Sequence, residues 1–145
     1  MLYNNRDLRV LKEEIEFVDT AIVPVMNIDF DSNLLHHANN LELIQHVTVQ
    51  LEKQLKGRLM ITPALTIVGG NTDALITYKD QLFEYGFKKI ISLSFDAAEA
   101  EDVNNIKVNS IPISDMDNEM KISIINDEVK TVIKQIINVL SLIHI

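Results

Sequence analysis

The stretch KKIISLSF, residues 88–95, decides the fold class of this chain. It is a short apolar run between a glycine and an acidic segment, which is typical of a buried strand. Two more apolar runs precede it, VDTAIVPVMNI at 18–28 and RLMITPALTIVGG at 58–70, and IKVNSIPIS follows at 106–114. The runs are continuously apolar, a pattern typical of parallel strands that are covered on both faces.

Helical patterns lie before, between and after these runs. Apolar residues recur at helical spacing in four segments, residues 6–17, 41–56, 72–86 and 124–142. Strands that alternate with helices predict right-handed crossovers and a three-layer α/β/α sandwich. We therefore expect one α/β domain over residues 1–145, Rossmann-like, with a mostly parallel sheet of about four strands whose order the pattern leaves open.

Prolines interrupt the first two predicted strands. Pro24 cannot donate to a hydrogen-bond ladder, so it predicts an edge strand or a strand end for residues 18–28. Pro63 bends the next run, which forms either one strand or a pair of strand pieces.

The composition excludes several classes of function. The 145 residues carry a formal net charge of −8, and Lys and Arg are scattered along the chain, so we expect no binding to nucleic acid or to an anionic membrane. The absence of cysteine excludes disulfides, thiol catalysis and cysteine-ligated zinc. Neither a signal peptide nor a spanning segment is apparent, and we expect a cytoplasmic protein.

Polar residues follow each of the four predicted strands. In an open parallel sheet the carboxyl ends of the strands share one rim, where ligands bind. The candidate ligand-binding residues on this rim are Asp29, Asp31, Gly69, Gly70, Asn71 and Asp96. The alternative is a set of solvated loops, because loops after strands are polar in any α/β protein.

The segment IVGGNTDAL is a candidate anion site within this rim. A strand, two glycines and a helix start would let backbone N–H groups and the helix dipole face a phosphate. The alternative is that Gly69 and Gly70 only turn the chain and that Asn71 caps the helix. We assign no catalytic residue, no metal ligand and no cofactor.

The segment DFDSNLL, residues 29–35, is similar to the nucleophile motif of haloacid-dehalogenase-type phosphatases. Asp29 and Asp31 have the spacing of that motif, in which the first carboxylate attacks phosphorus and Mg²⁺ is held nearby. Ser32 stands where the motif has Gly, and Asn33 where it has Thr, and no downstream pair of carboxylates completes a metal site. This phosphatase is therefore a remote alternative.

The C-terminal segment VLSLIHI, residues 139–145, is more apolar than one buried helical face requires. It either caps the core of the domain or forms a patch for a homodimer or a protein partner. Our first hypothesis is a non-enzymatic binding or protein-interaction module that uses apolar helix faces. The second is a binding protein for a small anion or a phosphorylated ligand at the rim.

Four segments together resemble a known family. FVDTAIVP (17–24), GRLMITPALTIVG (57–69), YGFKKIISLSFD (85–96) and NSIPISDM (109–116) resemble the YpiF-like family of Firmicutes, a domain of unknown function. The resemblance covers most of the chain and consists of core strand patterns. It implies a cytoplasmic bacterial protein and brings no activity, cofactor or catalytic residue with it.

Overall fold

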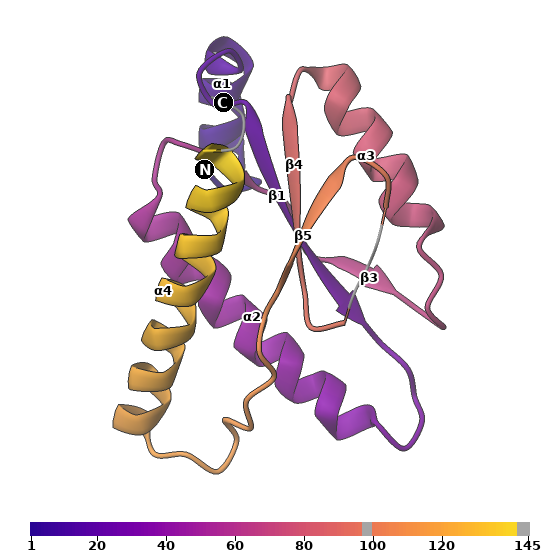
Figure 1. Ribbon diagram of the computed structural model, residues 1–145, viewed down its shortest axis with the longest axis vertical. Coiled ribbons are helices and arrows are strands. Elements are labelled where there is room, and N and C mark those ends of the chain that lie inside the picture. Colours follow the sequence, from indigo (N-terminus) through magenta and orange to yellow (C-terminus); the bar gives the residue numbers. More distant parts are fainter. Residues whose placement is uncertain (97–99, 142–145) are drawn as a thin grey trace.

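The computed structural model describes residues 1–96 and 100–141, which form a parallel sheet between two layers of helices (Figure 1). The strands are β1 (Thr20–Asn27), β2 (Met60–Ile61), β3 (Leu65–Ile67), β4 (Lys89–Ser94) and β5 (Val103–Lys107). The helices are α1 (Asn5–Glu14), α2 (Leu34–Gln54), α3 (Asp73–Tyr85) and α4 (Asn118–Ser141). The strand order is β2–β1–β4–β5, with β3 also paired to β1, and every pairing is parallel. The predicted α/β fold with a mostly parallel sheet is confirmed.

Side chains of β1 alternate between the two helical layers. Ile22 and Met26 are buried in the larger core with residues of α2 and α4. Val23 and Val25 are buried on the opposite face with Leu75 of α3. Because both faces of this strand are covered, nearly every position is apolar, as the continuous run in the sequence indicates.

Helix α1 covers the same face of the sheet as α3. Its Leu11 packs with Ala21 of β1 and Met60 of β2, and Leu82 of α3 contacts this cluster too. The helix begins where Asn4 accepts the backbone N–H of Asp7 through its side-chain oxygen at 2.7 Å, a capping bond that satisfies an otherwise free donor.

Two helices begin earlier than the apolar pattern predicts. α2 starts at Leu34 and not near residue 41. The apolar pattern missed its first turns because they are largely exposed and carry no apolar periodicity. α4 starts at Asn118 and not near residue 124, and the carboxylate of Asp117 accepts the N–H of Met120 at 2.8 Å. Asp117 therefore caps the N-terminus of α4.

The predicted position of the last strand was wrong. β5 covers Val103–Lys107, whereas the apolar pattern favoured residues 106–114. Asn105 explains the difference, because its side-chain oxygen accepts hydrogen bonds from the buried hydroxyls of Ser92 and Ser94 at 2.9 and 2.8 Å. Asn105 thus pairs with two serines inside the sheet. The polar composition of residues 103–107, taken alone, indicates a loop.

Some expectations fall outside the described residues. Residues 97–99 belong to the acidic segment that follows the run at 88–95, and residues 142–145 belong to VLSLIHI. Among the described residues, no helix combines the length and the apolar character that crossing a membrane requires.

The connections reverse direction at β1. The chain leaves β1 through α2 to reach β2 and β3 on one side, and it leaves β3 through α3 to reach β4 on the other side. The carboxyl ends of β1 and β4 therefore flank the topological switch point, where open α/β sheets bind ligands.

The edge strand contains a β-bulge between its two pieces. Ile22 pairs with Ile61 and Val25 pairs with Leu65, so the edge strand takes four steps where β1 takes three. The extra residue lies within residues 62–64 and interrupts the ladder. The alternative of two strand pieces bent at Pro63 is confirmed.

Pro24 is accommodated because its backbone nitrogen faces this bulge. Thr62 donates its N–H to the carbonyl of Ile22 at 2.9 Å, and Ile28 donates to the carbonyl of Ile67 at 2.9 Å. Polar backbone groups point to alternate sides along a strand, so Pro24 turns its nitrogen toward the edge strand as Ile22 and Ile28 do. The predicted edge position was wrong: β1 is central, and the missing donor coincides with the break in its neighbour.

Candidate functional site

A hydrogen bond bridges the two strands at the switch point. The side-chain amide of Asn27 donates to the carboxylate of Asp96 at 2.9 Å, across the ends of β1 and β4. Asn27, Asp96, His37 and Asn40 border a cavity of about 10 Å³. A space of this size holds at most about one water molecule, so the crevice is closed to an organic ligand in this conformation.

Asp29 and Gly69 join the two loops next to the switch point. Gly69 has a positive φ of 65° and donates its N–H to the Asp29 carboxylate at 3.1 Å. An acidic side chain therefore already occupies the amide that an anion would use.

The other rim residues are engaged locally. The carboxylate of Asp31 accepts the N–H of Asn33 at 2.8 Å, and the side chain of Asn71 accepts the N–H of Asp73 at 3.0 Å. Both bonds stabilise the starts of helices. Gly70 is exposed and has a φ of 71°. The structure thus brings Asp29 to Gly69 and Asp96 to Asn27, and the binding role of the six residues stays a prediction.

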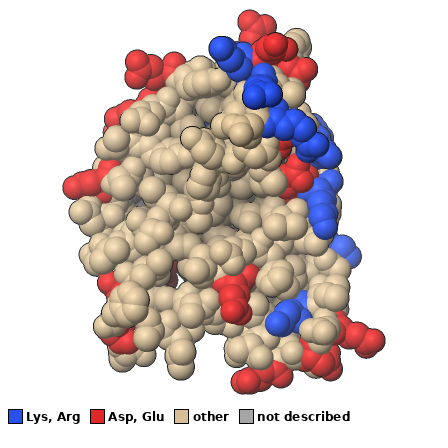
Figure 2. All heavy atoms as spheres, turned by 180° about the vertical axis from the view of Figure 1, so that it is seen from behind, with Lys and Arg blue, Asp and Glu red and all other residues tan. Residues whose placement is uncertain are grey.

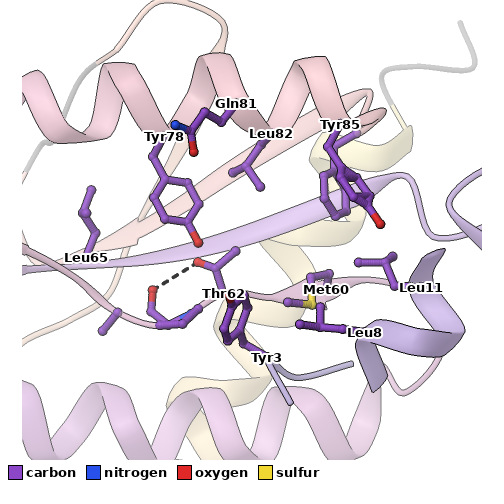
Figure 3. A pocket seen from close by; sticks show the side chains of 13 residues that line it. Tyr3, Leu8, Leu11, Met60, Thr62, Leu65, Tyr78, Gln81, Leu82 and Tyr85 are labelled. Atoms are coloured by element: carbon purple, nitrogen blue, oxygen red, sulfur yellow. Dashed lines mark hydrogen bonds between the residues drawn. The ribbon is translucent and has the colours of Figure 1, made fainter. Parts of the chain in front are cut away.

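A groove of about 620 Å³ opens at the edge of the sheet, on the face that carries α1 and α3 (Figure 3). The bulged edge strand from Met60 to Leu65 lines its floor. α1, with the segment before it, forms one wall and α3 forms the other.

The wall made by α3 carries two tyrosines. Tyr78, Leu82 and Tyr85 recur at helical spacing and line the groove together with Gln81. The ring of Tyr85 is half exposed and stacks on Phe87, with the ring centroids 6.0 Å apart. In Figure 3 the hydroxyl of Tyr78 points to the floor of the groove.

The opposite wall is apolar and ends in a third tyrosine. Leu8 and Leu11 of α1 line it, and Tyr3, 63% exposed, stands at its rim. Tyrosine combines a large apolar ring with a polar hydroxyl, which is why it is frequent in binding surfaces.

The bulge forms part of the floor of this groove, because Pro63 and Ala64 within it both line the hollow. Along a regular strand Met60 and Leu65 would point to opposite faces, since their positions differ by five, an odd number of steps. The extra residue restores the same facing, so both side chains line the groove. The hydroxyl of Thr62, between them, donates to the carbonyl of Pro63 at 3.2 Å and faces the same hollow.

Sequence reasoning missed the groove because three distant segments build it. Tyr78 and Leu82 read as one buried face of a helix. The available signal was the pair Tyr78 and Tyr85, seven positions apart on that face, because tyrosine is less often fully buried than leucine, isoleucine or valine.

These features define a small three-layer α/β protein with a closed switch point and an open groove at its sheet edge. The chain belongs to the family described as protein of unknown function DUF2487, whose profile matches residues 9–140. It is similar to the uncharacterized protein YpiF of Bacillus subtilis (strain 168), with 29% identity over 130 residues, 86% of this chain and 85% of that protein. The resemblance to a YpiF-like family is confirmed. No solved structure gives a significant match.

Proposed function

We propose that the protein is a non-enzymatic binding module and that the tyrosine-lined groove is its binding surface. The observation that carries the proposal is the groove itself, an open hollow of about 620 Å³ whose walls are mostly apolar. Ligand sites have volumes of about 300–1,000 Å³, with apolar and aromatic walls and a few polar groups that orient the ligand.

The lining favours binding over catalysis. The polar groups on it are the hydroxyl of Thr62, the amide of Gln81 and the tyrosine hydroxyls. General acid–base catalysis uses groups that exchange protons near neutral pH, above all His, Asp and Glu. None of these residue types lines the groove in the described part of the chain.

A blocking variant tests the proposal. Gln81 is exposed on the groove wall, so Gln81→Trp fills the hollow without entering the core. Gln45→Trp places the same side chain on an exposed position of α2, across the sheet, and serves as the matched control.

The readout is amide chemical shifts of ¹⁵N-labelled protein during titration with a library of aromatic and aliphatic fragments. We expect fragments to shift the amides of Thr62, Leu65 and Leu82 in wild type and in Gln45→Trp, and to leave them unchanged in Gln81→Trp. Shifts at the rim around Asp29 and Asp96, or no shifts at all, would refute the groove as the binding surface.

The rim supports a second proposal, binding of a small anion. Its observation is the carboxylate of Asp29 on the Gly69 amide, which shows that this N–H can hold a negative oxygen. Phosphate would have to displace Asp29, so phosphate should raise the melting temperature of Asp29→Ala more than that of wild type. Equal shifts for both proteins would count against this site. Separately, we propose a cytoplasmic location, which the family resemblance implies.

A further inference from the structure

We propose that the groove receives an extended, acidic peptide segment of a partner protein, which adds to the free edge of β3. The inference rests on the proposed binding function and specifies the partner. Three observations carry it: an open strand edge beside the groove, apolar walls with tyrosines, and basic side chains along one flank.

The strand edge offers backbone hydrogen bonds that a peptide satisfies. The carbonyl of Ile67 faces β1, where it accepts the N–H of Ile28 at 2.9 Å. The next backbone groups along the strand face the other way, so the N–H and C=O of Thr66 point outward from an exposed residue. An extended chain pairs with such an edge by main-chain bonds and places alternate side chains in pockets.

The N-terminal segment already uses the neighbouring edge in this way. Ile61 of β2 donates its N–H to the carbonyl of Met1 at 2.8 Å, and Leu2 forms a parallel bridge with Ile61. The pairing stops before the bulge, because the chain leaves the strand edge after Leu2 and enters α1 at Asn5. The edge of β3 beyond the bulge is left open beside the groove.

Basic side chains gather on the flank that belongs to α1. Figure 2 shows Lys and Arg in a stripe down one margin of a face whose middle is largely free of charge. α1, the last turn of α2 and the segment that leads into β2 supply the exposed side chains Arg6, Arg9, Lys12, Lys53, Lys56 and Arg58. α1 borders the groove through Leu8 and Leu11, and Met60, directly after the basic segment, lines the groove as well. The sequence indicated scattered basic residues, and the fold brings these together.

Most of these charges have no internal partner. Among the described residues, ion pairs within 4.0 Å involve Arg6, with Asp7, and none of the other five side chains. The same part of the molecule carries five carboxylates, of which Asp7 pairs with Arg6 and Glu52 with the N-terminal ammonium group. The other three, Glu13, Glu14 and Glu16, lie at and just after the end of α1. Although the protein has a net charge of −8, the basic side chains on this flank attract an acidic segment more than a basic one.

Nucleic acid fits the same surface less well. Bases could stack on the tyrosines, but a polynucleotide leaves the outward N–H and C=O of Thr66 without a strand partner. The net charge of −8 also repels a long polyanion, while a short acidic segment meets only the local basic flank.

Peptide display on wild-type protein, with counter-selection on Gln81→Trp, tests the inference. We expect groove-dependent peptides that combine Asp or Glu with at least one aromatic or β-branched residue. Fluorescence anisotropy of the best peptide should give a Kd about tenfold weaker for Arg9→Glu/Lys12→Glu, and binding should weaken as salt rises. The control Lys88→Glu/Lys107→Glu changes charge near the opposite edge of the sheet and should bind as wild type does.

Each other outcome overturns the inference. Groove-dependent peptides without acidic residues would reject the acidic partner and leave the groove as a binding surface. A failure to select any groove-dependent peptide would reject a peptide partner, and the fragment titration then decides the proposed function separately. Competition by a single-stranded oligonucleotide, or a dimer in sedimentation that Gln81→Trp abolishes, would assign the groove to nucleic acid or to a second copy.

Discussion

Asn27 donates its side-chain amide to the carboxylate of Asp96 at 2.9 Å and so ties the end of β1 to the end of β4 across the switch point. The bond joins residues 69 positions apart in the sequence. It closes the crevice in which open α/β sheets bind their ligands, and the larger hollow lies instead at the edge of the sheet.

A double-mutant cycle measures this bond. Asn27→Ala and Asp96→Ala should each lower the free energy of unfolding by about 1 kcal/mol, because each removes one partner of a partly exposed, charged hydrogen bond. The double variant should lose little more than either single variant, as measured by urea denaturation. Additive losses would mean that the two side chains act independently.

Glu128 and Asn109 form a second long-range contact, between α4 and the segment after β5. The buried carboxylate of Glu128 accepts the backbone N–H of Asn109 at 2.9 Å and its side-chain amide at 3.2 Å. Glu128→Ala leaves both donors without an acceptor and should cost about 2–3 kcal/mol in urea denaturation. Asp127→Ala, exposed on the same helix, is the control and should change stability by less than about 0.5 kcal/mol. Equal effects for the two variants would contradict this role.

Acid should weaken the anchoring of α1 through Asp7. The backbone N–H of Leu2 donates to this carboxylate at 2.9 Å and holds the pKa of Asp7 below its ordinary value, and Arg6 and Asn4 act in the same direction. A lowered folded pKa stabilises the protein fully above the unfolded pKa of about 3.9, and this contribution is lost as the pH falls through the folded pKa.

Asp7→Asn should therefore show a smaller loss of stability below about pH 4 than wild type. Urea midpoints measured from about pH 6 down to about pH 3 give the comparison. Parallel curves for the two proteins over this range would show that Asp7 is not linked to folding.

Deleting Ala64 should close the bulge and join β2 and β3 into one regular strand. With one residue fewer, the edge strand keeps the register of Ile61 through Leu65, and Pro63, which has no N–H, falls on the outward side. The protein should stay folded, with a change in unfolding free energy below about 2 kcal/mol. Met60 and Leu65 then lie four positions apart on the same face of one strand, so fragment binding in the titration described above should persist.

Deletion of Ser92 is the control for this experiment. It shifts the register of β4, which is buried on both faces, and should prevent folding as judged by circular dichroism. If the Ala64 deletion also unfolds the protein, the extra residue is needed for the sheet and is not only a feature of the groove.

Much of the fold follows from local patterns. The run at residues 88–95 predicts β4, observed at Lys89–Ser94, because a strand covered on both faces must be apolar at nearly every position. The helix predicted at 72–86 is observed at Asp73–Tyr85, and Gly86 ends it with a φ of 129°. β5 escaped prediction because Asn105 is paired inside the sheet with Ser92 and Ser94.

The sequence by itself determined the class of fold, through the period of its apolar residues, and the family to which the chain belongs. Only the tertiary structure decided which surface is available to a partner. The bulge opposite Pro24 depends on the register between two strands, and the groove depends on the walls that α1 and α3 place beside it. Register and packing are relations between segments far apart in the chain, so no local pattern of residues specifies them.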